Sequence, residues 1–451
     1  MTASHDPPPA AYTAAMRVSF RRCWLLPIVV ACSQAVAQLP LVEVAKLARA
    51  RAERSRPAQQ KALEPYWVDL ALDYRVNQQH LDTKIAEIAA LGDSVVPLLL
   101  EKMQPSQGGE TARNVAGNCR RVLEKLDPGS FVDALAEMAN GSNDIARTEA
   151  IRLLGSAQVP AAVTLLADLL DRTTGENKRL VVRSLRLLRA GAAAPKIAPM
   201  LASNDRQVRE DVLLYLLATK AAAVVDTVVQ ALGSERDEKL LPYYVDYFAA
   251  AVRGHDVAAR ALLPLLEPGR LDYQDCKHLV AALATIAPAD HDPTSRKLHE
   301  ILDRPDAASS LGVQAALSLK ALGDNRGVSK LKRTFEELFR KPARKKEAAL
   351  FEQRAALAFG TEDYGKAFDD YEAMLDNTDG PAMTRRAYIG LMKCEAHRKK
   401  ITNLQNLMKS SGLAVDEIDR IGADDPVFAQ TLQQDKMRAF LLQLAKDQAP
   451  K

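Results

Sequence analysis

The feature that most restricts the fold of this chain is an internal repeat of paired helical patterns. An apolar residue that would close the first helix of each pair recurs about every 33 residues. These residues are Leu91, Leu126, Leu154, Leu188, Leu217, Val252, Ile286 and Leu322. Another apolar residue stands three positions before each of them, which is the spacing of neighbours on one helix face. The repeat therefore predicts helix pairs that stack on one another.

The clearest pair lies on either side of Pro160. In its second helix, Ala162, Leu166 and Leu169 follow the spacing of a single apolar stripe, and the first helix shows the same spacing up to Leu154. Pro160 stands at the start of the second helix, where no backbone N–H is needed. Because one pair cannot bury both of its stripes alone, neighbouring pairs must cover them.

Composition supports a helical fold and excludes several other classes. The chain has 451 residues, of which 47% are hydrophobic, 5% aromatic and 26% charged. These values exclude a disordered chain, a collagen-like chain and a disulfide-rich miniprotein. The formal net charge of +4 is too small for a general nucleic-acid-binding protein, which would carry a strong and clustered basic excess.

Three segments of the repeat carry a more specific pattern. Residues 205–209 (DRQVR) open one pair, residues 144–147 (DIAR) open another less clearly, and residues 315–324 (AALSLKALGD) form a helix and a turn. These segments resemble the HEAT-repeat family, in particular the HEAT-like repeats of bilin lyases, over roughly residues 80–340. The resemblance implies an all-α fold, a right-handed α-solenoid, in which the Asp and Arg of the motif cap helices and link repeats. It implies no activity, because these positions are structural in the family.

The pattern changes after residue 340. Basic residues surround Pro342 and predict a solvated connector, with a site for phosphate or acidic lipid as the alternative. The helical pattern that follows resembles the second helix of a tetratricopeptide repeat, with Tyr364, Ala367 and Tyr371 at its packing positions. The first helix of this unit departs from the family pattern, because Arg354 occupies an apolar position.

The patterns divide the chain into five segments. These are an export signal at 1–37, an N-terminal helical cap at 38–79, a HEAT-like solenoid at 80–340, a tetratricopeptide-like segment at 341–412, and C-terminal capping helices with a tail at 413–451. Within the cap, residues 42–56 predict an amphipathic helix, and the spacing of Tyr66, Trp67, Leu70 and Tyr74 predicts another.

The N-terminal segment has the organisation of an export signal. Basic residues precede an apolar run, and small residues stand before a cleavage point between Ala37 and Gln38, with Met16 as the expected start. One alternative is a lipoprotein that carries its lipid on Cys32, and another is an uncleaved anchor. The expected location is extracytoplasmic, either periplasmic or secreted, or on a membrane as a lipoprotein.

Candidate chemistry is sparse in the rest of the chain. Cys119, Cys276 and Cys394 are too far apart in a stack of helices to form a disulfide, so we expect small buried hydrophobic residues. His299 and Glu300 are adjacent and would point in different directions on a helix, as would Cys276 and His278. The sequence therefore predicts no catalytic residue, no cofactor and no metal site.

The first functional hypothesis is a non-enzymatic scaffold that binds a protein or peptide partner, with no nucleic acid and with membrane contact only through the signal or a lipid anchor. The second helices would offer charged side chains of both signs to that partner. These are Glu101, Asp133, Asp168, Lys196, Asp226, Arg260, Lys297 and Lys330. The alternatives are an enzyme or ligand-binding protein with a pocket between repeats, and a lipid-anchored envelope assembly factor.

Overall fold

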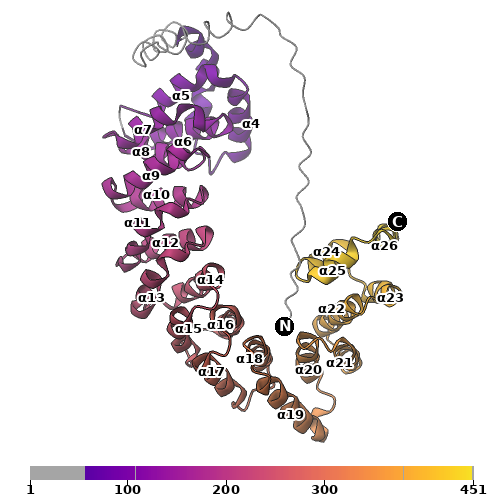
Figure 1. Ribbon diagram of the computed structural model, residues 1–451. Coiled ribbons are helices and arrows are strands. Elements are labelled where there is room, and N and C mark those ends of the chain that lie inside the picture. Colours follow the sequence, from indigo (N-terminus) through magenta and orange to yellow (C-terminus); the bar gives the residue numbers. More distant parts are fainter. Residues whose placement is uncertain (1–55, 107, 379, 449–451) are drawn as a thin grey trace, which may run out of the picture. The chain divides into compact units, whose positions relative to one another are not determined.

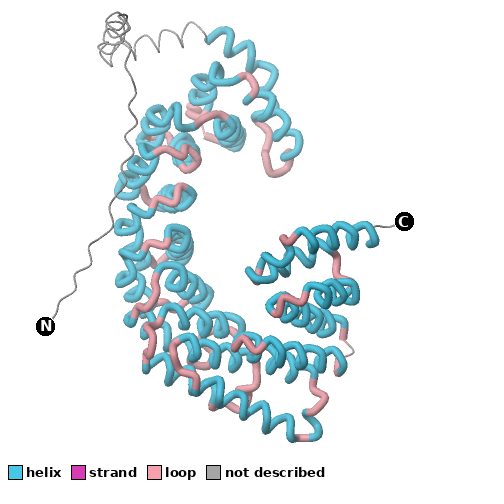
Figure 2. The backbone as a smooth tube through the Cα atoms, turned by 45° about the vertical axis from the view of Figure 1, so that its right-hand side comes forward, coloured by secondary structure: helices cyan, strands magenta, loops and turns pink. Residues whose placement is uncertain are grey.

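The computed structural model describes residues 56–106, 108–378 and 380–448. All regular secondary structure in these ranges is helical, and they contain no strand, as Figure 2 shows. The predicted all-α class is thus confirmed. The chain forms two compact units, one up to Leu126 and one from Asp127 onward. The predictions for Met16, Cys32, Ala37 and Gln38 lie outside the described residues.

The first unit packs its helices around α6. Its described elements are the helical residues 56–63, η1 (Glu64–Tyr66), α3 (Trp67–Leu70), α4 (Gln78–Ala89), η2 (Gly92–Val95), α5 (Val96–Lys102) and α6 (Glu110–Lys125). Helices α3, α4 and α5 all contact α6. The buried Asn118 of α6 donates hydrogen bonds of 2.9 Å to the carbonyls of Leu70 and Leu72, which satisfies the end of α3.

The helix predicted to reach Tyr74 is shorter than expected. Helix α3 ends at Leu70, and the chain then turns before α4. In this turn the carboxylate of Asp73 accepts a hydrogen bond of 2.9 Å from the backbone N–H of Arg75, and the Asn77 amide donates to the Asp73 carbonyl. Asp and Asn favour such local bonds over a continued helix, which is why the prediction fails here.

The second unit stacks helices in two layers (Figure 1). The first layer holds α8 (Asp144–Leu154), α10 (Gly175–Leu187), α12 (Arg206–Thr219), α14 (Leu241–Ala251), α16 (Tyr273–Ile286), α18 (Ser310–Ala321) and α20 (Ala348–Gly360). The second layer holds α7 (Val132–Asn140), α9 (Pro160–Arg172), α11 (Ala194–Ile197) with η5 (Ala198–Ala202), α13 (Val225–Ser234), α15 (Asp256–Leu262) with η8 (Leu263–Leu266), α17 (Asp292–Leu302) and α19 (Arg326–Arg340). Within each layer every helix contacts the next helix of that layer.

The predicted positions of the helix ends are confirmed. Each of the apolar residues that define the repeat lies within two residues of the C-terminal end of α4, α6, α8, α10, α12, α14, α16 or α18. Short 3₁₀ turns precede several of these helices. η3 (Pro128–Phe131), η4 (Gly191–Ala193) and η6 (Ala222–Val224) lead into the second-layer helices α7, α11 and α13, whereas η7 (Glu238–Leu240) and η9 (Pro342–Arg344) lead into the first-layer helices α14 and α20.

The second unit ends in six further helices. They are α21 (Tyr364–Asp376), α22 (Pro381–His397), α23 (Ile401–Ser411), α24 (Val415–Ala423), α25 (Pro426–Leu432) and α26 (Asp435–Gln448). The predicted packing residue Ala367 is fully buried, and the Tyr371 ring lies against Gly390 of α22. Arg354 stands at a position where the sequence pattern predicts an apolar residue. The fold accommodates it because its guanidinium donates hydrogen bonds of 2.9 and 2.7 Å to the buried carboxylate of Asp370.

Candidate functional site

Most of the charged residues expected to meet a partner are engaged with neighbouring helices. Lys196 of α11 lies 3.1 Å from Asp171 of α9, and Lys297 of α17 lies 2.6 Å from Glu267, which follows η8. The other ion pairs of this set join Lys330 to Asp303, Arg260 to Asp256, Asp168 to Lys196 and Glu101 to Arg56. Asp133 and Asp226 have no ion pair among the described residues. Exposed pairs of this kind stabilise a fold by about 0–1 kcal/mol each, so these residues remain accessible to a partner.

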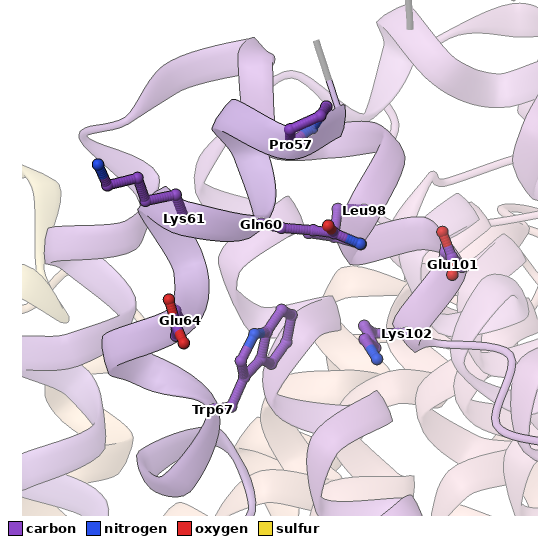
Figure 3. A pocket seen from close by; sticks show the side chains of 8 residues that line it. All are labelled: Pro57, Gln60, Lys61, Glu64, Trp67, Leu98, Glu101 and Lys102. Carbon is purple, nitrogen blue, oxygen red and sulfur yellow. The ribbon is translucent and has the colours of Figure 1, made fainter. Parts of the chain in front are cut away.

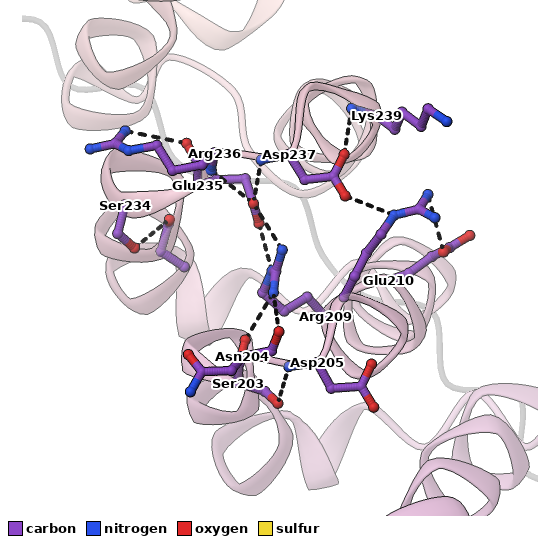
Figure 4. A network of polar contacts seen from close by, with 12 residues as sticks. Ser203, Asn204, Asp205, Arg209, Glu210, Ser234, Glu235, Arg236, Asp237 and Lys239 are labelled. Atoms are coloured by element: carbon purple, nitrogen blue, oxygen red, sulfur yellow. Dashed lines mark hydrogen bonds and ion pairs between the residues drawn. The ribbon is translucent and has the colours of Figure 1, made fainter.

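The motif at residues 205–209 forms a polar network, shown in Figure 4. The Asp205 carboxylate caps α12 by accepting a hydrogen bond of 2.8 Å from the backbone N–H of Gln207, as predicted. The guanidinium of Arg209 binds both oxygens of Glu235, at 2.9 and 3.1 Å, and donates to the carbonyl of Ser203. A hollow of about 350 Å³ adjoins this network. Because its Arg and Glu are already paired, we assign the network a structural role.

The motif differs from the prediction at one helix cap only. Arg209 links successive pairs as predicted, because its guanidinium donates to the carbonyl of Ser203, at the end of η5, and also binds Glu235, at the end of α13. A further link between pairs comes from Arg179 of α10, whose guanidinium lies 2.9 Å from Asp211 of α12. At the weaker motif the cap of α8 is Asn143, which stands one residue before the expected Asp144. Both residues can cap a helix, and spacing alone does not decide which one does.

The first unit contains a hollow that combines apolar surface with charge (Figure 3). Its volume is about 620 Å³, within the range of known ligand pockets. The lining residues come from 57–67 and from α5, and they are Pro57, Gln60, Lys61, Glu64, Trp67, Leu98, Glu101 and Lys102. The half-buried indole of Trp67 lies between Glu64 and Lys102 in this view.

The charges around Trp67 are arranged in distinct ways. The Lys102 ammonium lies 5.3 Å from the centre of the indole ring, a distance suited to a cation–π interaction. The Glu101 carboxylate accepts two hydrogen bonds of 2.8 Å from the Arg56 guanidinium. Lys61 and Glu64 are exposed at the rim and have no ion pair among the described residues. The hollow thus offers an aromatic face together with groups that bind either charge.

Sequence reasoning found only part of this hollow. It named Glu101 as a candidate contact residue and Trp67 as part of the cap, and it did not bring the two together. The indole and the Lys102 ammonium are far apart in the chain, so no local spacing indicates that they meet. Trp67 is the single tryptophan after the predicted export signal, and this rarity is the sequence feature that could have indicated a binding site at the hollow.

The histidines serve mainly in pairs with aspartate. Nε2 of His299 lies 2.9 Å from Asp324, while Glu300 pairs with Lys297, so His299 and Glu300 do not converge. Nε2 of His278 lies 2.8 Å from Asp246. Similar pairs are His80 with Asp69, His291 with Asp256, and His397 with Asp425. No group of three or more His, Cys, Asp or Glu side chains suited to a metal ion occurs in the described ranges.

The three cysteines in the described part of the chain are free thiols. Cys119 and Cys394 are buried, as predicted, and burial raises the pKa of each thiol to about 12. Cys276 is half-buried, so the prediction of a buried residue is wrong at this position. Burial raises the pKa of Cys276 as well, which disfavours its thiolate and hence its use as a nucleophile.

Comparison with known proteins supplies no further assignment. No protein-family model matches the chain, and no curated protein matches it either. None of the described helices has the length and apolar character needed to span a membrane.

Proposed function

We propose that this protein is a HEAT-like, right-handed α-solenoid with tetratricopeptide-like helices after it, and that it acts as a non-enzymatic scaffold for a protein or peptide partner. Support comes from the two stacked layers of the second unit, because stacked helix pairs expose a long surface relative to their core. The ion pairs along that surface carry both signs of charge, which suits a protein partner better than a polyanion.

The observation that carries this proposal is the hollow around Trp67. Tryptophan is among the residues that contribute most to binding energy at protein interfaces, especially where polar groups surround it. Here Trp67 is half-buried, and the Lys102 ammonium lies over its indole ring. Lys61 and Glu64 at the rim are exposed and could form ion pairs with a partner. A segment that places an apolar side chain on the indole could pair with both rim charges.

Photo-crosslinking from within the hollow tests this proposal. A photoreactive residue at Gln60, which lines the hollow, should capture the same partner in repeated preparations. Trp67→Ala should abolish that capture, because it removes the aromatic face. Val68→Ala is the matched control, since Val68 is the next residue and is 78% exposed. Capture that is unaffected by Trp67→Ala, or that never selects a reproducible partner, would contradict the proposal.

We also propose that the protein acts outside the cytoplasm, with cleavage before Gln38 or, as the alternative, a lipid on Cys32. The support is the order of basic, apolar and small residues at the N-terminus. Mass spectrometry of the N-terminus of protein isolated from cells distinguishes the two forms. An N-terminus that retains the whole segment would argue against both.

A further inference from the structure

The connection between α19 and α20 is rich in positive charge. Five basic residues lie within seven positions, and we call them the basic turn: Arg340, Lys341, Arg344, Lys345 and Lys346. All five side chains are exposed. Helix α19 buries Leu331 and Phe335 on its other face, so the fold holds the start of the turn in place.

Most of the charge in the basic turn is not neutralised by the protein. Arg344 binds both carboxylate oxygens of Glu347, at 3.0 and 2.7 Å. The other four side chains have no hydrogen bond or ion pair with any residue that the structure describes. This differs from the second-layer lysines Lys196, Lys297 and Lys330, each of which has a carboxylate partner. Four unpaired cations within seven positions therefore produce a local positive potential.

A hollow adjoins the basic turn on the same unit. Its volume is about 580 Å³, and Arg344 and Glu347 form part of its lining. Tyr273, Leu338 and Leu350 are among its apolar lining residues. The Tyr273 side chain is held in place, because its hydroxyl lies 2.9 Å from Oγ of Ser310 and accepts a hydrogen bond from the backbone N–H of Leu311. The hollow is large enough for an apolar side chain of a bound segment.

We infer that the basic turn and this hollow together dock an acidic protein segment, with an apolar side chain in the hollow and a neighbouring run of carboxylates on the basic turn. This inference rests on the proposed function in that the ligand is again a protein segment, but it concerns another site. Charge complementarity selects an acidic ligand, and the hollow selects one with an apolar side chain beside the acidic run.

The surroundings favour an acidic peptide over a membrane or a nucleic acid. A membrane-surface site combines basic residues with exposed large apolar residues that enter the lipid. Among the described residues, the exposed large hydrophobic residue beside the basic turn is Tyr273, at 45%, and hydrogen bonds to its hydroxyl hold it in the hollow, so it is not free to enter lipid. Binding of single-stranded nucleic acid stacks successive bases on several aromatic side chains beside the cations. The basic turn contains no aromatic residue, and Tyr273 is the one aromatic residue among the described residues that line the hollow.

Fluorescence anisotropy with the full chain tests this inference. The probe is a labelled synthetic peptide with one phenylalanine beside a short run of glutamates, measured at low salt. Reversing the four unpaired charges to glutamate at positions 340, 341, 345 and 346 should weaken binding at least about tenfold. Added salt should weaken binding by the unchanged protein, because exposed charges are screened.

A matched control separates a local site from general charge attraction. The control variant reverses four exposed basic residues that have no side-chain partner among the described residues and lie elsewhere in the second unit: Lys239, Arg253, Lys399 and Lys400. It carries the same net charge as the test variant, and circular dichroism should show that both remain helical. Equal weakening by the two variants would overturn the inference, as would no effect from reversal of the basic turn.

The hollow has its own test. Replacing Ala349, which lines the hollow, by tryptophan should fill it and remove the preference for the phenylalanine peptide over one with glycine at that position. This variant should still bind both peptides through their glutamates. If phosphatidylserine vesicles bind through the basic turn and the peptide does not, the acidic-peptide assignment is wrong. Trp67→Ala should leave the affinity for the acidic peptide unchanged. The inference about the basic turn can therefore fail without affecting the proposal for the Trp67 hollow, and the reverse also holds.

Discussion

The phenol of Tyr247 on α14 donates a hydrogen bond of 2.8 Å to the carbonyl of Ala221, which lies in the turn after α12. The same arrangement occurs one repeat earlier, where the Tyr215 hydroxyl on α12 donates at 2.5 Å to the carbonyl of Ala190 after α10. Both tyrosines are fully buried. Helices α12 and α14 are therefore each tied to the end of the preceding first-layer helix by a tyrosine that also fills the core.

The first prediction compares two tyrosines of α14. Tyr247→Phe should destabilise the protein by about 1 kcal/mol, because it removes a hydrogen bond and leaves the buried carbonyl of Ala221 without that donor. Tyr244→Phe should be neutral or slightly stabilising, because the buried Tyr244 hydroxyl has no hydrogen-bond partner among the described residues. Urea unfolding of both variants measures the difference, and equal destabilisation would contradict the assigned bond.

The second prediction concerns alkaline pH. Burial raises the pKa of Tyr215 and that of Tyr247 from 10.0 to about 12. Because the folded-state pKa lies above the unfolded value, each group contributes stability that is complete below pH 10 and is lost as pH rises toward 12. The free energy of unfolding should therefore fall across this range. The free energy of unfolding of the double variant Tyr215→Phe/Tyr247→Phe should fall less over the same pH range. An identical pH profile for the two proteins would argue against the raised pKa values.

The sequence predicted the helices better than the contacts between them. The helix ends near Leu154 and Ile286 follow from apolar spacing, which is a local property of the chain. The ties made by Tyr215 and Tyr247 were not predicted, because a buried tyrosine fits an apolar stripe whether or not its hydroxyl finds a carbonyl. Stripe spacing therefore reports which face is buried and not which polar atoms meet.

The candidate sites show the same division between local and distant information. The cap made by Asp205 could be predicted, since its partner N–H is two residues away. The partner of Arg209 could not be named from the sequence, because Glu235 is brought close only by the packing of α13 on α12. The hollow around Trp67 likewise needs α5 to place Lys102 on the indole.

The third prediction concerns the thiols. Cys276 is half-buried, whereas Cys119 and Cys394 are buried with pKa values raised to about 12. We expect iodoacetamide to alkylate Cys276 slowly in the native protein and the other two only after denaturation, because access and the thiolate form are both required. Mass-spectrometric mapping of modified peptides measures this order. Native labelling of Cys119 or Cys394 ahead of Cys276 would contradict the packing of α6 or α22.

The last prediction uses two helical glycines. A Cβ at Gly390 of α22 would lie 2.5 Å from the ring of Tyr371 on α21, so Gly390→Ala should destabilise the protein by about 1–3 kcal/mol through overpacking. A Cβ at Gly233 of α13 would meet nothing within 4 Å, so Gly233→Ala should stabilise it by up to about 1 kcal/mol, because alanine favours a helix. Thermal unfolding of each variant gives the sign of the effect. A rise in Tm for Gly390→Ala would contradict the close packing of α21 on α22, whereas a fall for Gly233→Ala would show that this part of α13 has a neighbour.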